Sequence, residues 1–164
     1  MKKIFAIIIA LLLAVFLPSC ATASFADSST CAELGELIEA TVNDGQEYIP
    51  HDDTHRSLYF DDVEEYDDYF SAYSANTSDI SEFGVFHAPN DEAAAELYDE
   101  VCDYVSDMQN EQRAFIASYA PDELSKLDAA KVKKFGNYVV YTVLDKDTAN
   151  AVFKKIEVFL TQNK

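Results

Sequence analysis

Apolar residues recur three or four positions apart in three segments, which is the period of a helix that buries one face. Thr30 and Glu33 have the spacing of a capping box, Asn90 precedes two acidic residues, and Asp145 or Asp147 precedes the last apolar stripe. The predicted helices span 30–42 (Cys31, Leu34, Ile38, Val42), 91–119 (Ala94, Leu97, Val101, Val105, Met108, Ile116) and 146–160 (Ala149, Val152, Ile156, Leu160).

Other segments have the alternation or the aromatic and branched residues that strands prefer. Strands are predicted over 69–76, 80–88, 131–135 and 138–144, the last two joined by a tight turn at Gly136-Asn137. Residues 46–58 are expected to form a loop, residues 61–67 one or two helical turns, and residues 122–127 a further turn.

The predicted order of the main elements, with the short helical turns left out, is α-β-β-α-β-β-α. Strands linked as hairpins favour an antiparallel sheet, and helices with one apolar face favour packing on such a sheet. We therefore expect a single α+β domain over residues 30–162, with about four strands and helices packed mainly on one face.

The first residues have the order of a secretory signal. Lys2 and Lys3 precede an uninterrupted apolar run over 4–17, which is followed by small and polar residues. The run is shorter than the roughly 20 residues that span a bilayer. We predict a signal peptide over 1–23 and a flexible tether over 24–29, and therefore a bacterial protein that works outside the cytoplasmic membrane.

The cleavage position has two interpretations. Leu17-Pro18-Ser19-Cys20 resembles a bacterial lipobox, whose cysteine is acylated and becomes the N-terminus, although Pro18 departs from the usual small or aliphatic residue. Ordinary cleavage after Ala23 or Ala26 also fits the small-x-small rule. We expect a membrane-anchored lipoprotein with Cys20 as the lipidated residue, and a freely secreted protein as the alternative.

The chain is strongly acidic. It has 30 Asp and Glu against 12 Lys and Arg, a net charge of −18, and removal of Lys2 and Lys3 makes it more negative. Between residues 24 and 112 the sole basic residue is Arg56. Such a charge repels nucleic acid and anionic lipid headgroups, so neither is an expected ligand. The acidic part is either a solvated surface or a docking surface for cations or a basic partner.

Two cysteines remain when Cys20 is lipidated or removed. Cys31 and Cys102 each fall on a predicted helix, on or near its apolar face. Outside the cytoplasm they could form a disulfide. The alternative is that both are separate buried thiols that behave as small hydrophobic residues.

Two groups of ionisable residues could hold a metal ion. Histidine and carboxylate ligands suit zinc, and closely spaced carboxylates suit calcium, but neither group has a recognised metal-binding spacing. A solvated loop is the alternative for each. The candidate ligands are His51, Asp52 and His55 in the first group, and Asp61, Asp62, Glu64, Glu65, Asp67 and Asp68 in the second.

No catalytic motif is present. The chain has no Gly-x-Ser-x-Gly elbow, no cysteine in a nucleophile signature, and only 4 Gly, so it has no phosphate-cradling loop. No catalytic residue is therefore predicted, and no cofactor apart from calcium.

Three short segments resemble an uncharacterised bacterial family, the domain-of-unknown-function 4358 family. They are Glu82-Phe83-Gly84-Val85-Phe86 before the long acidic helix, Tyr119 with Pro121 after that helix, and Lys131-Val132 followed by Gly136-Asn137-Tyr138-Val139. The resemblance spans about residues 31–160. It implies a small exported protein, commonly lipidated, and it implies no activity or catalytic residue.

The sequence therefore favours a non-enzymatic envelope protein that binds another envelope protein or a cell-surface polymer. The second hypothesis is a module that associates with divalent cations, chiefly calcium, through the acidic segment 44–68. The third hypothesis is a hydrolase without an identifiable motif.

Overall fold

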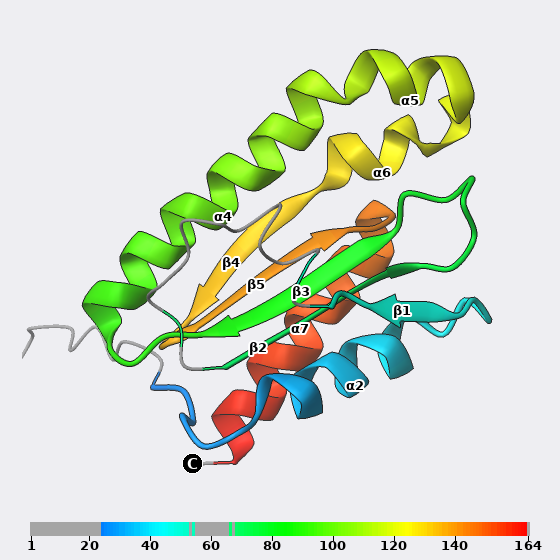
Figure 1. The fold of residues 1–164 in the computed structure, drawn as a ribbon. Helices are drawn as coiled ribbons and strands as arrows, with labels where there is room; N and C mark the ends of the chain where they lie inside the picture. The colour runs from blue at the N-terminus through cyan, green and yellow to red at the C-terminus, as the bar shows by residue number, and fades with distance from the viewer. Residues whose placement is uncertain (1–23, 53, 55–65, 67, 164) are drawn as a thin grey trace, which may run out of the picture.

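The structure, a computed structural model, describes residues 24–52, 54, 66 and 68–163. Its strands form one five-stranded antiparallel sheet in the order β1-β2-β3-β5-β4 (Figure 1). The strands are β1 (Tyr48–Pro50), β2 (Asp68–Ser74), β3 (Glu82–His87), β4 (Lys131–Phe135) and β5 (Tyr138–Val143). The helices are α2 (Cys31–Val42), α4 (Asp91–Glu111), α5 (Arg113–Tyr119), the 3₁₀ helix η1 (Pro121–Glu123), α6 (Leu124–Ala129) and α7 (Lys146–Gln162).

The predicted α+β class, the antiparallel sheet and the helical segments 30–42 and 146–160 are confirmed, whereas the segment predicted over 91–119 is divided at Gln112 into α4 and α5. The predicted loop over 46–58 is wrong at its start, because Tyr48–Pro50 forms the edge strand β1 against β2. A proline is tolerated at a sheet edge, where one side of the strand makes no ladder bonds. The helical turns predicted over 61–67 lie outside the described residues, apart from Tyr66.

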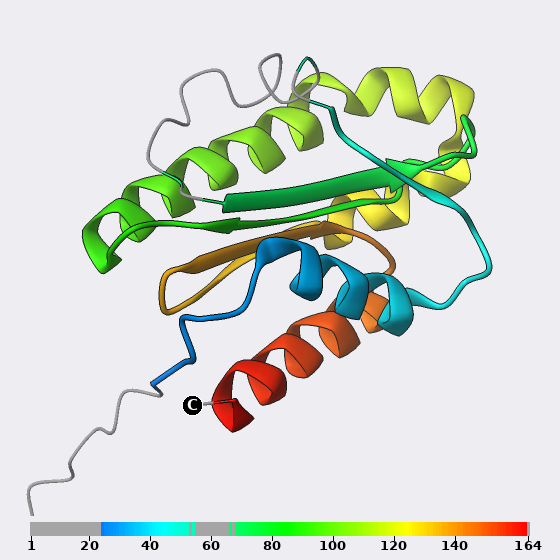
Figure 2. The same ribbon diagram turned by 60° about the horizontal axis from the view of Figure 1, so that its bottom comes forward.

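Helices cover both faces of the sheet, and the prediction that they pack mainly on one face is wrong. Helices α2 and α7 lie on one face, and α4, α5 and α6 lie on the other (Figures 1 and 2). The central strand β5 shows the cause, because every residue from Tyr138 to Val143 is buried. Tyr138 and Val140 pack towards α2 and α7, whereas Val139 and Tyr141 pack towards α4.

The helix starts follow the predicted caps. Thr30 and Glu33 form a reciprocal capping box at α2, and the Asn90 side chain accepts from the backbone of α4. Asp145 occupies the cap position of α7 without a side-chain cap bond. These local bonds satisfy backbone N–H groups that a helix start leaves without partners.

Residues 24–29 are packed against the domain instead of forming the predicted tether. The Phe25 ring lies 5.6 Å from the Phe135 ring, edge to face, and the buried Ala26 donates its N–H to Leu160 O at 2.7 Å. Asp27 accepts from His87 at 2.8 Å and from Asn137 at 3.0 Å. The segment was assigned as a tether because its residues are small and polar, but its Phe25 and Ala26 enter the core beside α7.

The strands run between two ends of the molecule that differ in construction. We call the end with residues 24–29 and the turn 136–137 the hairpin end, and the end with α5, η1, α6 and the turn 75–81 the α5 end. Figures 1 and 2 place them at opposite ends of the strands, with the blue N-terminal segment far from α5. The functional candidates described below gather at the α5 end.

Candidate functional site

The candidate metal ligands are only partly within the described residues. His55, Asp61, Asp62, Glu64, Glu65 and Asp67 lie outside them. Within the described ranges, no three His, Cys, Asp or Glu side chains come together as a metal site.

The described candidates have structural contacts. His51 Nδ1 lies 3.0 Å from Ser71 Oγ, and Asp68 accepts the N–H of Cys31 at the start of α2 at 2.7 Å. A carboxylate at a helix N-terminus stabilises that helix. Cation binding by the segment 44–68 stays a prediction, which a melting curve with added calcium or zinc tests.

Cys31 and Cys102 are both free thiols, so the candidate disulfide is not formed. Cys31 is buried under α2 on one face of the sheet, and Cys102 is on α4, which covers the other face. The sheet therefore separates the two thiols. The alternative interpretation of two separate cysteines describes the structure, although Cys102 is only partly buried.

A cavity of about 280 Å³ lies at the α5 end, between the start of β3, the last turns of α4 and the beginning of α5. Its apolar wall comes from Met108 and Ile116, both nearly buried, and from Ile80. Its polar and aromatic wall consists of His51, Tyr73, Asp79, Ser81, Glu82, Tyr104 and Gln112. The cavity thus combines a small apolar surface with a few convergent polar groups, as ligand sites do.

Glu82 is the carboxylic acid at the centre of this wall. Its Oε1 accepts the Tyr104 hydroxyl at 2.7 Å and the Tyr141 hydroxyl at 2.5 Å. Burial raises the pKa of Glu82, and the hydrogen bonds from Tyr141 and Tyr104 only partly offset that effect. Neither hydroxyl carries a charge, so the carboxylate, when ionised, has hydrogen-bond donors but no basic counter-ion among the described residues.

The position of the Tyr141 hydroxyl depends on Gly84. The two residues are paired across β3 and β5, and a Cβ at Gly84 would overlap the Tyr141 ring. The missing side chain lets the ring lie flat over β3 and lets its hydroxyl reach Glu82. The sequence indicated a close approach at Gly84, but it did not indicate that an aromatic ring makes it.

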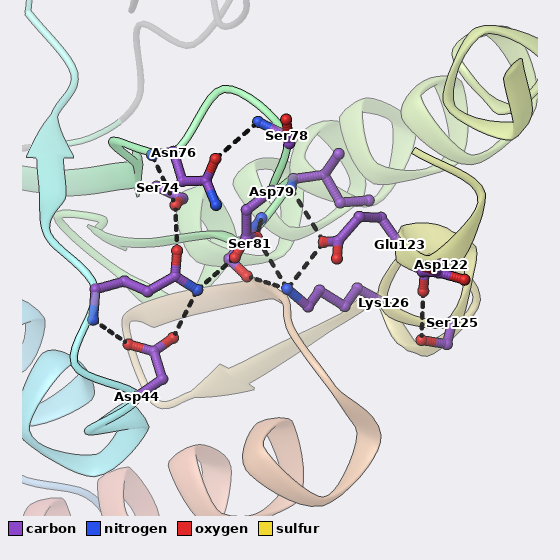
Figure 3. A network of polar contacts seen from close by, with 12 residues as sticks. Asp44, Ser74, Asn76, Ser78, Asp79, Ser81, Asp122, Glu123, Ser125 and Lys126 are labelled. Carbon is purple, nitrogen blue, oxygen red and sulfur yellow. Dashed lines mark hydrogen bonds and ion pairs between the residues drawn. The ribbon is translucent and has the colours of Figure 1, made fainter. Parts of the chain in front are cut away.

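A second polar cluster joins the turn 75–81 to α6 (Figure 3). Lys126 Nζ lies 2.9 Å from Asp79 Oδ1 and 2.8 Å from Glu123 Oε2. Asp79 also accepts from the Gln46 side chain and from the Ser81 N–H. The side chains of Asp79 and Lys126 are 6% and 13% exposed, so these ion pairs are shielded from water.

The charges in this cluster stabilise one another. Burial alone would raise the pKa of Asp79, but hydrogen bonds from Ser81, Lys126 and Gln46 together hold that pKa well below its ordinary value. Burial likewise would lower the pKa of Lys126, yet its bonds to Glu123 and Asp79 raise it. Both groups are therefore charged at neutral pH.

Ser81 lies close to Lys126, with its Oγ 3.0 Å from Nζ. A serine beside a lysine can act as nucleophile and base when the lysine loses its proton. Here the raised pKa of Lys126 keeps the proton, and Ser81 is 2% exposed. The pair is arranged as part of the ion-pair cluster and not as an activated nucleophile.

An exposed aromatic pair stands on α5 beside the cavity. Phe115 and Tyr119 are 62% and 76% exposed, and their ring centroids are 4.5 Å apart. Ile116, between them in sequence, points inward and lines the cavity. The other large apolar side chains with high exposure in the described ranges, Ile49 and Val158, lie on different elements.

Sequence reasoning missed most of this site. Glu82 occurred only as part of a family motif and an alternating strand, and Lys126 and Asp79 were not selected. One signal was available: the run from Tyr138 to Val143, apolar or aromatic except for Thr142, indicates a strand covered on both faces. If helices cover both faces of the sheet, Glu82 lies under one of them. A carboxylate is rarely buried without a partner, so Glu82 would have been selected as a candidate.

These features define a small α+β domain with helices on both faces of its sheet and a partly polar cavity at one end. The chain belongs to the family described as Domain of unknown function (DUF4358), whose model matches residues 51–144. That range contains every residue that lines the cavity. No significant match was found among curated proteins or among solved structures.

Proposed function

We propose that this protein is an exported, non-enzymatic envelope protein that binds a partner protein through the α5 end. The observation that carries the proposal is the Phe115–Tyr119 pair, whose rings are mostly exposed and in contact with each other. Exposed aromatic side chains supply much of the energy of protein interfaces when a partner covers them. An isolated domain gains nothing by holding two such rings in water.

Three further observations support this proposal over a hydrolase. The serine nearest a base is buried, the base retains its proton, and the cavity carboxyl group Glu82 is held by two tyrosines. General acid–base chemistry needs a group that can exchange its proton near the working pH at an accessible position. Lys126 and Ser81 do not meet this requirement.

Export is supported by the charged and apolar start of the chain. Among the described residues, no helix combines the length and the apolar character needed to cross a bilayer. Cleavage after Ala26 would remove Phe25 and Ala26, which pack against Phe135 and α7. The packing therefore favours cleavage before Cys20 or after Ala23, and the mass of the mature protein distinguishes these two products.

The partner is identified by crosslinking in the cell. A photoreactive amino acid in place of Phe115 should capture a partner, which mass spectrometry then identifies. The matched control carries the same amino acid in place of Val158, which is exposed on α7. Recovery of the protein alone, or equal capture from both positions, would contradict the proposal, whereas a captured glycan would replace the protein partner by a polymer.

The double variant Phe115→Ala/Tyr119→Ala tests the same surface without a crosslinker. Both side chains are exposed, so their removal should change the free energy of unfolding by no more than about 0.5 kcal/mol. The same variant should lose the captured partner. A variant that binds the partner as well as the unchanged protein does would show that the aromatic pair is not the binding surface.

A further inference from the structure

The cavity at the α5 end contains an acidic side chain, Glu82, whose hydrogen-bond partners among the described residues are uncharged. In the described part of the chain, no lysine or arginine forms an ion pair with Glu82, whose hydrogen bonds come from Tyr104 and Tyr141. The nearby Lys126 is already matched by Asp79 and Glu123. An ionised carboxylate in a partly buried position is stabilised by a cation at close range.

The rest of the wall indicates what kind of cation fits. Tyr73 and Tyr104 contribute aromatic rings, which attract cations, and Ile80, Met108 and Ile116 contribute apolar surface. A metal ion would need several oxygen or nitrogen ligands in place of that apolar surface. A cavity of about 280 Å³ lies just below the range of roughly 300–1,000 Å³ typical of drug-sized ligands, so the occupant is small.

The hydrogen bonds of Glu82 select between the two common organic cations. Both tyrosine hydroxyls donate to Oε1, so little acceptor capacity is left on that oxygen. A guanidinium group binds a carboxylate best through two parallel bonds, one to each oxygen. An ammonium group is a compact donor that needs only Oε2.

We propose that this cavity binds a primary ammonium group carried on a short alkyl chain, with Glu82 as its counter-ion. The alkyl chain lies along Met108 and Ile116, and the ammonium group lies near the rings of Tyr73 and Tyr104. Such a group is supplied either by a lysine side chain of another protein or by a free alkylamine. The site does not depend on the partner surface proposed above, because purified protein can be tested alone.

The experiment is a titration of the ¹⁵N-labelled mature protein, followed by amide chemical shifts at neutral pH and low salt. The probes are 1,5-diaminopentane as a free amine and Nα-acetyl-lysine methylamide as a side chain. Saturable shifts are expected around Ile80, Tyr104, Met108 and Gln112. Pentan-1-ol, which has the alkyl chain without the charge, should bind at least about tenfold more weakly than the better amine.

Two variants test the two parts of the proposal. Glu82→Gln keeps the size and an acceptor for both tyrosines but removes the charge, so amine affinity should fall about tenfold or more. Met108→Phe fills the cavity and should abolish the shifts. This second variant tests whether the amine binds in the cavity, even when the Glu82 variant does not fold. The matched control Glu96→Gln changes an exposed carboxylate on α4 and should bind as the unchanged protein does.

The outcomes separate the proposal from its alternatives. Binding of only the lysine derivative identifies a partner side chain as the source, and binding of only the diamine identifies a free amine. The proposal is overturned by an absence of saturable shifts with both amines, or by unchanged affinity in Glu82→Gln. Equal or tighter binding of Nα-acetyl-arginine methylamide would overturn the choice of ammonium. Failure of this titration would leave the crosslinking result at Phe115 unaffected.

Discussion

The two ends of the sheet are covered by the chain to different extents. At the hairpin end the chain covers itself, because residues 24–29 lie over the turn 136–137 and beside the last turn of α7. At the α5 end the chain leaves a cavity, a buried ion-pair cluster and two exposed aromatic rings. The hairpin end is therefore closed by the chain's own packing, whereas the α5 end combines a stabilising ion-pair cluster with a cavity and two exposed rings that do not add to stability.

This difference shows where a search for function should begin in a protein without a catalytic motif. Burying a carboxylate without a counter-ion and exposing aromatic rings both oppose folding or solubility. Neither is required by the sheet or by the helices that cover it. Groups of this kind at one end of a domain are best explained by something that binds there.

The largest expected effect comes from the ion-pair cluster at the α5 end. Lys126→Ala leaves Asp79 and Glu123 without their cation, and breaking a buried pair in this way costs about 3–5 kcal/mol. Urea denaturation measures the loss. The matched control Lys154→Ala removes an exposed lysine from α7 and should be nearly neutral. A loss below about 1 kcal/mol for Lys126→Ala would mean that the cluster is solvated like a surface pair.

The next effect tests whether the hairpin end is held by its N-terminal segment. Phe25→Ala removes a half-buried ring and its edge-to-face contact with Phe135, which should cost about 1–2 kcal/mol. Thermal unfolding of the mature protein measures this change. Phe115→Ala, at the exposed pair, is the control and should cost little. Equal stability of the Phe25 variant and the unchanged protein would restore the idea of a free tether.

A smaller effect concerns the pH dependence of stability. The folded state raises the pKa of Glu82 above its ordinary value of 4.5, so the folded protein binds the proton more tightly than the unfolded chain. The free energy of unfolding therefore falls as pH rises from about 4.5 through that raised pKa. Asp79, whose pKa is lowered, acts in the opposite sense and loses its contribution only as pH falls below its ordinary value.

Glu82→Gln isolates the first of these two contributions. The variant should gain stability relative to the unchanged protein as pH rises from 4.5 to 7, because the fall due to Glu82 is absent. Denaturation at a series of pH values provides the measurement, with Glu96→Gln as a control that should run parallel to the unchanged protein. A constant difference in the free energy of unfolding between Glu82→Gln and the unchanged protein over this range would show that the pKa of Glu82 is not raised by folding.

The smallest expected effect is that of a reductant. Cys31 and Cys102 are free and separated by the sheet, so a reductant should leave the melting temperature unchanged. Burial, followed by the charge and hydrogen bond of Asp68, raises the pKa of the Cys31 thiol. A thiol reagent should therefore label Cys102 in the folded protein and Cys31 only after unfolding. A lower melting temperature on reduction would indicate a disulfide.

The local elements were predictable because each depends on neighbours in sequence. The capping box at Thr30 and the Asn90 cap require residues only two or three positions apart, and the Gly136 turn requires one positive φ. Contacts between distant segments were not predictable in this way. The edge strand β1 forms because it pairs with β2. Residues 24–29 are held in place because Phe25 packs against Phe135 and Ala26 donates a hydrogen bond to Leu160.

The candidate site also depends on contacts between residues that are distant in sequence. Glu82 meets Tyr104 and Tyr141 across separations of 22 and 59 residues, and Lys126 meets Asp79 across 47. No spacing pattern in the chain marks such pairs. The sequence instead selected the dense acidic run 61–68, which draws attention by composition and lies mostly outside the described residues.

If Cys20 is acylated, the packing of residues 24–29 limits the distance between the domain and the lipid anchor. Ser24 follows Cys20 by four positions, and a fully extended chain spans at most about 3.5 Å per position, or about 14 Å in all. An acylated Cys20 would thus hold the hairpin end almost against the bilayer. Helix α7 runs from the α5 end to the hairpin end over 17 residues, about 25 Å. The aromatic pair would face outward at that modest height, within reach only of molecules that themselves lie close to the membrane.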